Sequence, residues 1–376
     1  MFISTQEELA ELCDRLSHER VIAVDTEFIR EKSYYPRLCL IQLGCEGLTA
    51  AVDPFAVSDL EPIAALMRDP KITKVFHACS QDLEVISHAL GVVPAPVFDT
   101  QVVAAFLGHR TQLGYGALVK SYTGVSLPKS SSLTDWSRRP LDADQLEYAE
   151  DDVRYLPGIY EAMVAELLEK DRMGWVEPEL AAVCDPARYA HDPREAYTHL
   201  RHAGSLTRKQ LGVAREVAAW RETEAMRRDI PRRWVVSDEV LVEVSRRMPP
   251  TPDKLRRVRG TEQLNNHAVG ALLAAVKKGL ACPESDLPTQ RRRNRPAANV
   301  EPVVDLMYAL VRIVSERSGV AAPLIANRDD LADFVVDQGA RKLREGWRWE
   351  LAGKQLTRLL EGRVGLTVKG MRVEIL

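Results

Sequence analysis

The sequence predicts an N-terminal α/β domain with a mixed sheet, followed by two small all-helical domains. Short apolar runs rich in β-branched residues alternate with helical spacing up to about residue 100, and helical spacing dominates afterwards. Two proline-containing breaks interrupt this pattern, and the second carries a run of arginines. We therefore predict an α/β domain over residues 1–170, a linker over 171–206, a helical domain over 207–285, a basic linker over 286–299 and a second helical domain over 300–376.

The strands of the predicted sheet are apolar runs bounded by turn-forming residues. They cover residues 21–24, 38–43, 50–54, 74–77 and 97–99, and Pro54 is expected to stop the third strand. Helical spacing over residues 60–67 predicts one helix between them, and a second helix is expected to end at Gly91. Near the C-terminus, alternation over residues 364–376 predicts a small hairpin that turns at Lys369-Gly370.

The composition is that of a folded protein without membrane segments. Hydrophobic residues make up 45% and charged residues 28% of the 376 residues, which excludes a disordered chain. No apolar run approaches the roughly 18–20 residues that span a bilayer, and the N-terminus lacks the features of a secretory signal. The six cysteines are scattered without a Cys-x-x-Cys pair, so we expect reduced thiols, no structural zinc site and a cytoplasmic location.

Two segments of the chain carry opposite net charges. Residues 1–165 contain 14 Lys and Arg against 24 Asp and Glu, a net charge of −10. Residues 207–283 contain 16 Lys and Arg against 9 Asp and Glu, a net charge of +7. The acidic segment suits cation binding and the basic segment suits a polyanion, although ordinary solvated surfaces would give the same balance.

Asp25 and Glu27 directly follow the first predicted strand. Residues two apart on an extended chain project from one face, so the two carboxylates are expected side by side. Next to a buried strand they repel each other and lose hydration, and Mg²⁺ or Mn²⁺, which prefers oxygen ligands, relieves both effects. An isolated Asp-x-Glu triplet also arises by chance, so this pair alone does not identify a metal site.

Three further residues extend this acidic set. Asp82 lies near the start of a predicted helix, where the helix dipole favours a carboxylate for purely structural reasons as well. Tyr148 and Asp152 are four residues apart in a helical segment and therefore share one face. A tyrosine hydroxyl in that place can orient a water molecule; the alternative is an aromatic residue that packs beside a solvated carboxylate.

In their order and spacing, these pieces resemble the three exonuclease motifs of the DEDD superfamily, in the subclass with a tyrosine in the last motif. Within that superfamily, residues 1 to about 165 resemble the ribonuclease D family. The segments that carry this resemblance are Val24-Asp25-Thr26-Glu27-Phe28, Ile41-Gln42-Leu43, Phe98-Asp99-Thr100-Gln101, Thr134-Asp135-Trp136 and Tyr148-Ala149-Glu150-Asp151-Asp152. The family's spacing selects Asp152 over Asp151 as the last carboxylate, and the resemblance implies an RNase H-like fold.

The resemblance implies a 3′→5′ exoribonuclease with two Mg²⁺ or Mn²⁺ ions about 3.5–4 Å apart around the scissile phosphate. Asp25 would bridge both ions, and Asp82 would serve one of them. Glu27 and Asp152 would complete the other ion site, while Tyr148 would orient the attacking water. In-line attack would release a nucleoside 5′-monophosphate. The implied substrate is RNA with a free 3′ end, such as a tRNA precursor, and no obligatory protein partner is expected.

Other residues near these motifs are candidates for RNA contacts. Phe28 either stacks on the terminal base, as aromatic rings do with any base, or packs in the core. His77 either contacts a phosphate or is a satisfied interior histidine. Lys129 either contacts the RNA backbone or is a solvated surface residue. Trp136 is expected to be a core anchor.

Residues 207–285 resemble an HRDC domain, a small helical module. The segments that carry this resemblance include Val217-Ala218-Ala219-Trp220-Arg221-Glu222, Ile230-Pro231, Val235-Val236-Ser237-Asp238 and Leu255-Arg256-Arg257-Val258-Arg259-Gly260. The positive charge makes arginines such as Arg221 and Arg228 candidates for phosphate contacts, against the alternative of a solvated helical surface. Residues 300–376 resemble the second, more divergent HRDC-like domain of the same family through Gly346-Trp347-Arg348.

Two other functions are compatible with the same fold. A DNA 3′→5′ exonuclease needs the same carboxylates, although the paired HRDC-like arrangement favours RNA as the substrate. A catalytically silent RNA-binding protein is the second alternative. The presence of all five motif residues argues against it.

Overall fold

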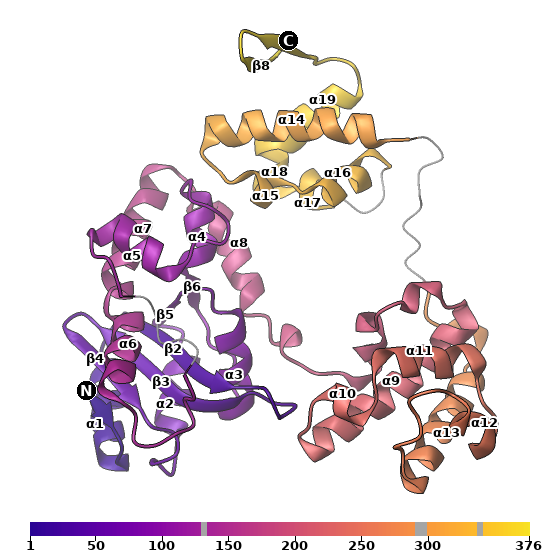
Figure 1. The fold of residues 1–376 in the computed structure, drawn as a ribbon. Helices are drawn as coiled ribbons and strands as arrows, with labels where there is room; N and C mark the ends of the chain where they lie inside the picture. The colour runs from indigo at the N-terminus through magenta and orange to yellow at the C-terminus, as the bar shows by residue number, and fades with distance from the viewer. Residues whose placement is uncertain (129–133, 290–298, 337–340) are drawn as a thin grey trace. The chain divides into compact units, whose positions relative to one another are not determined.

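The computed structural model describes residues 1–128, 134–289, 299–336 and 341–376 (Figure 1). The chain divides into two compact units. Unit 1 comprises Met1–Glu27, Leu38–Arg188 and Arg295–Leu376, and unit 2 comprises Phe28–Arg37 and Tyr189–Asn294. No helix in the described ranges combines the length and the apolar character needed to cross a membrane.

The N-terminal part of unit 1 is built on a six-stranded mixed sheet in the order β1-β4-β3-β2-β5-β6. Its strands are β1 (Phe2–Ile3), β2 (Val21–Ile29), β3 (Arg37–Cys45), β4 (Leu48–Val52), β5 (Thr73–Phe76) and β6 (Val97–Asp99). The pairs β1–β4, β2–β5 and β5–β6 are parallel, and β3–β4 is antiparallel. The predicted mixed sheet is therefore confirmed. The two residues of β1 were not predicted because so short a segment has no readable periodicity.

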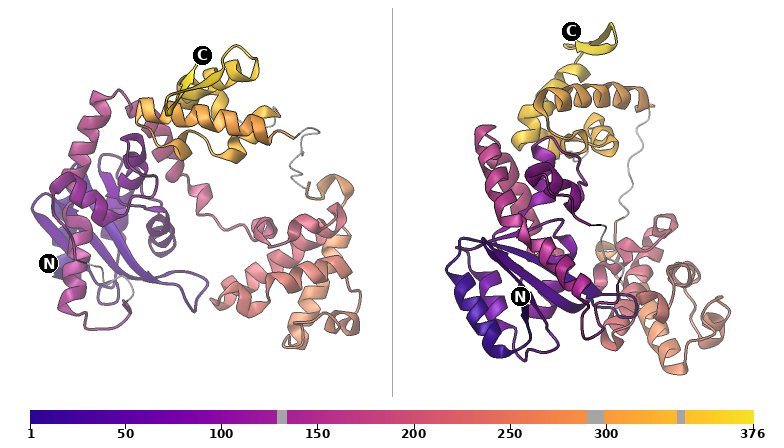
Figure 2. Two further views of the ribbon diagram at one scale, coloured as in Figure 1. Left: turned by 45° about the horizontal axis from the view of Figure 1, so that its top comes forward. Right: turned by 60° about the vertical axis from the view of Figure 1, so that its left-hand side comes forward.

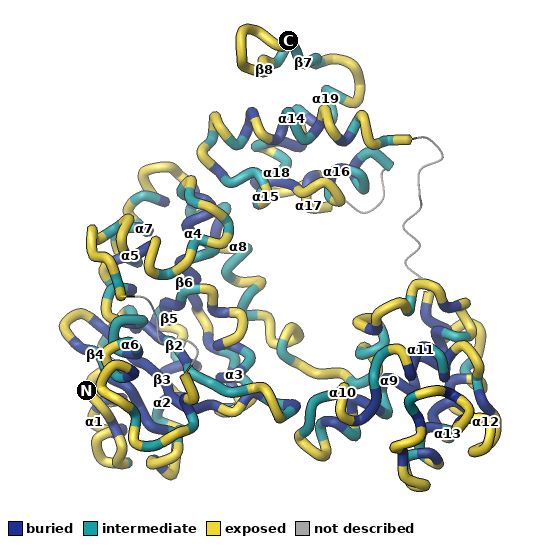
Figure 3. Tube along the Cα trace, viewed as in Figure 1, coloured by how far each residue is buried: buried dark blue, intermediate teal, exposed yellow. Residues whose placement is uncertain are grey.

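Strand β2 is longer than predicted. It continues from Val21 to Ile29, so Asp25 and Glu27 lie within the strand and do not follow it. The prediction ended β2 where the apolar run ends, but a strand is held by backbone hydrogen bonds to its neighbours and can continue through polar side chains. In Figure 3 the central strands of the sheet are largely buried.

Helices cover both faces of the sheet (Figure 2). They are α1 (Gln6–Ser17), α2 (Glu61–Arg68), α3 (Ser80–Leu90), α4 (Thr100–Phe106), α5 (Tyr115–Thr123), α6 (Ala143–Arg154), α7 (Leu156–Glu169) and α8 (Met173–Val183). Helix α3 ends as predicted at Gly91, whose φ of 66° is the left-handed conformation that glycine adopts freely. Helix α8 and the 3₁₀ turn η1 (Pro186–Arg188) lie in the segment that was predicted as a linker.

The C-terminal part of unit 1 is helical and ends in a hairpin. Its elements are α14 (Glu301–Ser318), α15 (Ala322–Ile325), α16 (Arg328–Val335), α17 (Arg341–Arg344), α18 (Gly346–Arg348), the π-helical turn η5 (Trp349–Gly353), α19 (Lys354–Leu360), β7 (Leu366–Lys369) and β8 (Arg372–Ile375). The antiparallel pairing of β7 with β8 confirms the hairpin predicted for the tail.

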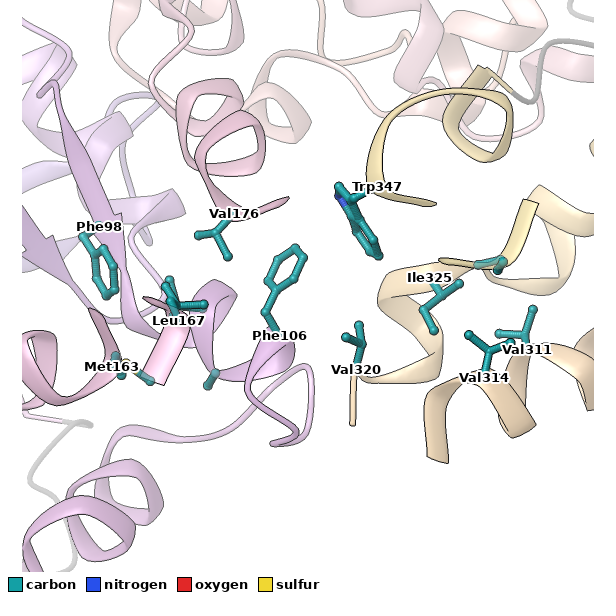
Figure 4. Packing of buried hydrophobic residues seen from close by; sticks show 14 of the residues in the cluster. Phe98, Phe106, Met163, Leu167, Val176, Val311, Val314, Val320, Ile325 and Trp347 are labelled. Carbon is teal, nitrogen blue, oxygen red and sulfur yellow. The ribbon is translucent and has the colours of Figure 1, made fainter. Parts of the chain in front are cut away.

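This C-terminal part shares a hydrophobic core with the α/β part (Figure 4). The ring of Phe106 at the end of α4 lies 5.1 Å from the ring of Trp347, edge to face. The backbone N–H of Ala321 donates to the carbonyl of Ala105 at 3.1 Å. The guanidinium of Arg172 donates to the backbone carbonyl of Phe106 and to that of Ser318 at the end of α14, which adds a charge-assisted hydrogen bond between the two parts.

Unit 2 is a helical bundle to which the short segment Phe28–Arg37 is added. Its elements are η2 (Pro193–His199), η3 (Ala203–Ser205), α9 (Arg208–Arg228), α10 (Arg232–Val235), α11 (Asp238–Arg247), α12 (Pro252–Arg256), α13 (Asn266–Leu280) and η4 (Glu284–Asp286). A capping box at Thr207 begins α9, the longest of these helices.

The helical part of unit 2 and the C-terminal part of unit 1 share a succession of elements, which starts at α9 in the former and at α14 in the latter. In each, a long helix is followed by a four-residue helix, two extended residues and a further helix. The first extended residue is Val236, with φ −168°, in unit 2 and Ala326, with φ −158°, in the C-terminal part. The likeness agrees with an internal duplication, while the HRDC-like assignment of residues 300–376 stays a prediction.

Candidate active site

Three carboxylates from two elements form a compact cluster in unit 1. Asp25 and Glu27 alternate with Thr26 on β2 and therefore project from one face of the strand. Asp152 comes from the last turn of α6. One carboxylate oxygen from each of the three lies within 4.8 Å of the others. The structure thus brings together residues that are about 125 positions apart in the chain.

Asp82 lies in the first turn of α3, as predicted, and its side chain is buried. The hydroxyl of Thr26 donates to its carboxylate at 2.6 Å. Thr26 was not predicted as a site residue, because a threonine between two acids is unremarkable in a strand. Thr26 alternates with Asp25 and Glu27, so its side chain projects from the opposite face of β2. Its hydrogen bond connects that face to Asp82, the fourth carboxylate of the predicted site.

The turn that leads into α3 is held in a strained conformation. Ala78 has φ 60°, which is unfavourable for a residue with a Cβ atom. The carboxylate of Asp99 accepts hydrogen bonds from the backbone N–H groups of Ala78 and Cys79, each at 3.0 Å. The same carboxylate caps α4 by accepting a hydrogen bond from the backbone N–H of Gln101 at 2.8 Å. Asp99 therefore stabilises the turn that presents Asp82.

Tyr148 and Asp152 share one face of α6, as the spacing predicted. The Tyr148 hydroxyl lies beside the Asp152 carboxylate, and burial together with the charges of Asp152, Glu27 and Asp25 raises the pKa of the phenol. The aromatic ring of Tyr148 lies against the ring of Trp136, with 6.0 Å between the ring centroids. Trp136 is only 2% exposed, which confirms its expected place in the core.

The electrostatics of the cluster disfavour four negative charges. Burial, reinforced by the charges of Asp82, Asp152 and Glu27, holds the pKa of Asp25 well above its usual range. Burial and the charges of Asp152 and Asp82 raise the pKa of Glu27 to about 8. Burial likewise raises the pKa of Asp82 to about 6 and that of Asp152 to about 7. The protein alone pays a free-energy penalty for ionising this site.

The cluster fits a divalent cation. All of its ligand atoms are carboxylate oxygens, which are the ligands preferred by Mg²⁺ and Mn²⁺. Within the described residues, the Oδ2 atom of Asp152 is buried without a hydrogen-bond partner. A buried, unpartnered carboxylate oxygen is costly unless it coordinates a cation. A divalent cation between Asp25, Glu27 and Asp152 would satisfy that oxygen and offset the repulsion among the three acids.

A cavity of about 330 Å³ opens beside this cluster. It is lined by Tyr115, Gly116, Leu127, Pro128, Tyr148, Asp151 and Asp152. The Tyr115 hydroxyl donates to the backbone carbonyl of Asp151 at 2.7 Å, next to the metal-binding candidate Asp152. Tyr115 was missed by the sequence analysis, since it lies 33 residues from Tyr148 and outside every recognised motif.

The candidate RNA-binding residues have different outcomes. Both ring nitrogens of His77 are engaged, Nδ1 with the Thr100 hydroxyl and Nε2 with the Leu113 carbonyl, each at 2.9 Å. This favours the satisfied interior histidine over the phosphate contact. Phe28 is partly buried on β2, and its role in base stacking stays a prediction. Lys129 lies outside the described residues.

The prediction of a phosphate contact needs correction at Arg221. Its side chain is only 5% exposed and donates to Asp238 at 2.7 Å and to the backbone carbonyl of Val236 at 3.2 Å. A guanidinium used in this way inside a bundle is unavailable to RNA. Arg228 is half exposed and 3.7 Å from Glu224, so its phosphate contact stays a prediction.

Comparison with known proteins agrees with this geometry. A family model described as 3′-5′ exonuclease matches residues 1–168, and a model of the HRDC domain matches residues 210–276. Ribonuclease D of Acidiphilium cryptum is 41% identical over 383 residues, covering all of this chain and 96% of the relative. Ribonuclease D of Nitrobacter hamburgensis is 40% identical and covers 99% of this chain and 98% of the relative.

A solved structure gives the same result. The crystal structure of Escherichia coli RNase D, an exoribonuclease involved in structured RNA processing, matches with a TM-score of 0.82 and 34% identity, covering 96% of this chain and 98% of that chain. The predicted exonuclease fold and the HRDC domain of unit 2 are confirmed. The chain therefore belongs to the ribonuclease D family and is a metal-dependent 3′→5′ exoribonuclease.

Proposed function

We propose that Asp25, Glu27, Asp82 and Asp152 bind two divalent cations, Mg²⁺ or Mn²⁺, and that Tyr148 acts with them in hydrolysis of the 3′-terminal phosphodiester. The observation that carries this proposal is the set of three carboxylate oxygens within 4.8 Å, one of whose carboxylates keeps a buried oxygen without a partner. Bound cations would neutralise the phosphate oxygens and lower the pKa of the attacking water.

The residues of the chain have separate tasks in this proposal. Asp25 would contribute to both cation sites. Glu27 and Asp152 would complete one site, and Asp82, whose carboxylate accepts from the Thr26 hydroxyl, would serve the other. Tyr148 orients the attacking water through its hydroxyl, which lies beside Asp152. The water oxygen would bond to the phosphorus and the 3′ oxygen of the preceding nucleotide would leave, so the product is a nucleoside 5′-monophosphate and no side chain forms a covalent bond to the substrate.

The substrate we propose is RNA with a free 3′ end, with tRNA precursors as the natural class, in the cytoplasm. Structured RNA processing is the role stated for the E. coli relative. The net charge of +7 over residues 207–283 supports backbone contacts by the HRDC domain, since such contacts are electrostatic and independent of base sequence. We propose that residues 300–376 form the second, HRDC-like domain and extend the RNA path.

The deciding experiment is a time course on a 3′-extended tRNA and on matched RNA and DNA oligonucleotides, with identification of the products. The wild-type chain should shorten RNA from the 3′ end in Mg²⁺ or Mn²⁺, release 5′-monophosphates, and stop in EDTA. Asp25→Asn should abolish hydrolysis while RNA binding persists. Asp14→Asn, which changes an exposed carboxylate on α1, is the matched control. Full activity of Asp25→Asn, activity in EDTA or a preference for DNA would each reject the proposal.

A further inference from the structure

A segment that belongs to no helix or strand covers the ring of Tyr148. Residues 134–142 precede α6, and Trp136 within this segment lies 6.0 Å from the Tyr148 ring at an interplanar angle of 36°. The segment is also tied to α6 by Gln145, whose side-chain amide donates to the Thr134 hydroxyl at 3.2 Å. The place of Trp136 therefore limits the rotation of the phenol whose hydroxyl meets Asp152.

Arg139 holds this segment through every hydrogen-bond donor that its guanidinium has. Nε and Nη2 form a fork with the Asp53 carboxylate at 2.6 and 2.8 Å. Nη1 donates to the carbonyls of Trp136 at 2.9 Å and Arg138 at 2.8 Å. The second N–H of Nη2 donates to the carbonyl of Cys39 at 2.7 Å. An arginine has five N–H donors in a planar array, and all five are used here.

The anchor of this contact is the central sheet. Asp53 directly follows β4, its side chain is only 6% exposed, and its backbone N–H donates to the carbonyl of Ile3 at 2.9 Å. Cys39 lies within β3. The guanidinium also stacks over the ring of Phe55, 4.7 Å from its centroid. Arg139 thus connects two strands to the carbonyl of Trp136, the residue that packs on Tyr148.

We propose that Arg139 is a positioning residue for hydrolysis. Its ion pair with Asp53 holds Trp136 against the Tyr148 ring and so fixes the direction of the Tyr148 hydroxyl at Asp152. Arg139 acts through these residues and touches neither RNA nor metal. The inference rests on the proposed role of Tyr148 in orienting the attacking water.

Arg139→Lys is the informative substitution, because it keeps the charge and removes the planar fork. In the full chain we expect kcat on a 3′-extended RNA to fall about tenfold to a hundredfold. This range is typical of residues that hold metal-site residues in position without binding the metal. KM for the RNA and the affinity for Mn²⁺, measured by calorimetry, should not change. Arg68→Lys, which alters an exposed pair with Glu61 on α2, is the matched control and should retain full kcat.

A double-mutant cycle with Tyr148→Phe separates positioning from general support of the fold. If Arg139 acts through the Tyr148 hydroxyl, Arg139→Lys should change kcat by no more than about twofold in the Tyr148→Phe background. An equal loss in both backgrounds, or a rise in KM at unchanged kcat, overturns the inference and leaves the role of Tyr148 intact. Full activity of Tyr148→Phe alone overturns both.

Asp53→Asn provides a second route if Arg139→Lys does not fold. It keeps the size of the side chain and weakens the fork from the opposite partner. The same cycle with Tyr148→Phe should again show an effect on kcat that disappears when the phenol hydroxyl is absent. Loss of kcat that persists without that hydroxyl counts against the inference in this variant too.

Discussion

Carboxylates that are at least partly withdrawn from solvent occur in both units, and the charges around them have opposite signs. In unit 2 the side chain of Glu222 is 5% exposed, and Arg232 pairs with it at 2.7 Å while the Tyr34 hydroxyl donates to it. Burial alone would raise the pKa of Glu222, but the hydrogen bonds from Arg232 and Tyr34 lower it overall. In unit 1 the charges that act most strongly on Asp25 are those of other carboxylates, and its pKa is raised.

The same contrast holds for Glu216 of unit 2. Its side chain is 3% exposed and is met by Lys278 at 2.7 Å and by Arg194 at 2.9 Å. The negative charge of a buried acid that pairs with Lys or Arg side chains is balanced as soon as the chain folds, so such an acid stabilises the fold. The partly buried acids of unit 1 form no such ion pair within the described ranges, so their charges stay unbalanced until a cation binds from solution. The comparison therefore distinguishes structural carboxylates from the proposed metal ligands in one molecule.

Replacing Asp152 by Asn should give the largest effect, because it removes one member of the incomplete cluster at nearly constant shape. We expect kcat on a 3′-extended RNA to fall at least about a thousandfold, equivalent to about 4 kcal/mol in the barrier. Steady-state kinetics in Mg²⁺ or Mn²⁺ measures the loss. The matched control is the adjacent Asp151→Asn, whose carboxylate lies 3.3 Å from Arg154 and should cost less than about tenfold. Equal losses would contradict the choice of Asp152.

The pH dependence of stability should have opposite signs in the two regions. The pKa of Glu27 is raised to about 8 in the folded chain, whereas a glutamate in the unfolded chain has a pKa of about 4.3. The contribution of Glu27 to the free energy of unfolding is therefore fully present below about pH 4.3 and is lost as the pH rises through about 8. Because the pKa of Glu222 is lowered, its contribution is present above the unfolded value and is lost as the pH falls.

Urea unfolding in EDTA tests this difference. Glu27→Gln should stabilise the metal-free chain by about 2 kcal/mol at pH 8, with allowance for the partial exposure of Glu27, and have little effect near pH 4.5. Glu222→Gln should destabilise the chain at pH 7 and do so less at low pH. At pH 8 in saturating Mn²⁺, Glu27→Gln should instead be less stable than the wild-type chain, because the bound metal ion stabilises the ionised carboxylate of Glu27. A stabilisation of Glu27→Gln that is independent of pH would argue against a raised pKa.

Removing the Arg232 guanidinium, which pairs with Glu222 in unit 2, should have a smaller effect than the substitutions in the carboxylate cluster. Arg232→Met leaves Glu222 with the Tyr34 hydroxyl as its remaining partner, and we expect a loss of about 1–3 kcal/mol in the free energy of unfolding. Arg228→Met is the control, because its pair with Glu224 is exposed and 3.7 Å long, and it should change stability by at most about 1 kcal/mol. Equal changes in the two variants would mean that burial of Glu222 does not matter.

The five proposed catalytic positions could be predicted because each belongs to a local pattern. Alternation on a strand defines the common face of Asp25 and Glu27, and four-residue spacing on a helix does the same for Tyr148 and Asp152. Glycine at residue 91 is an equally local stop signal for α3. The order of these patterns along the chain then carried the resemblance to a nuclease family. Such features depend on neighbours in sequence and survive without knowledge of the fold.

Partners across elements were decided by the tertiary structure. Arg139 and Asp53 are 86 residues apart, and no periodicity relates them. Arg221 has the charge expected of a phosphate contact, yet packing buries it beside Asp238. Charge and spacing report what a side chain is and which face of its own element it occupies. Whether that face meets a cation, a carboxylate or solvent depends on the packing of distant segments, and this packing separates the structural acids of unit 2 from the acids of unit 1 that we propose as metal ligands.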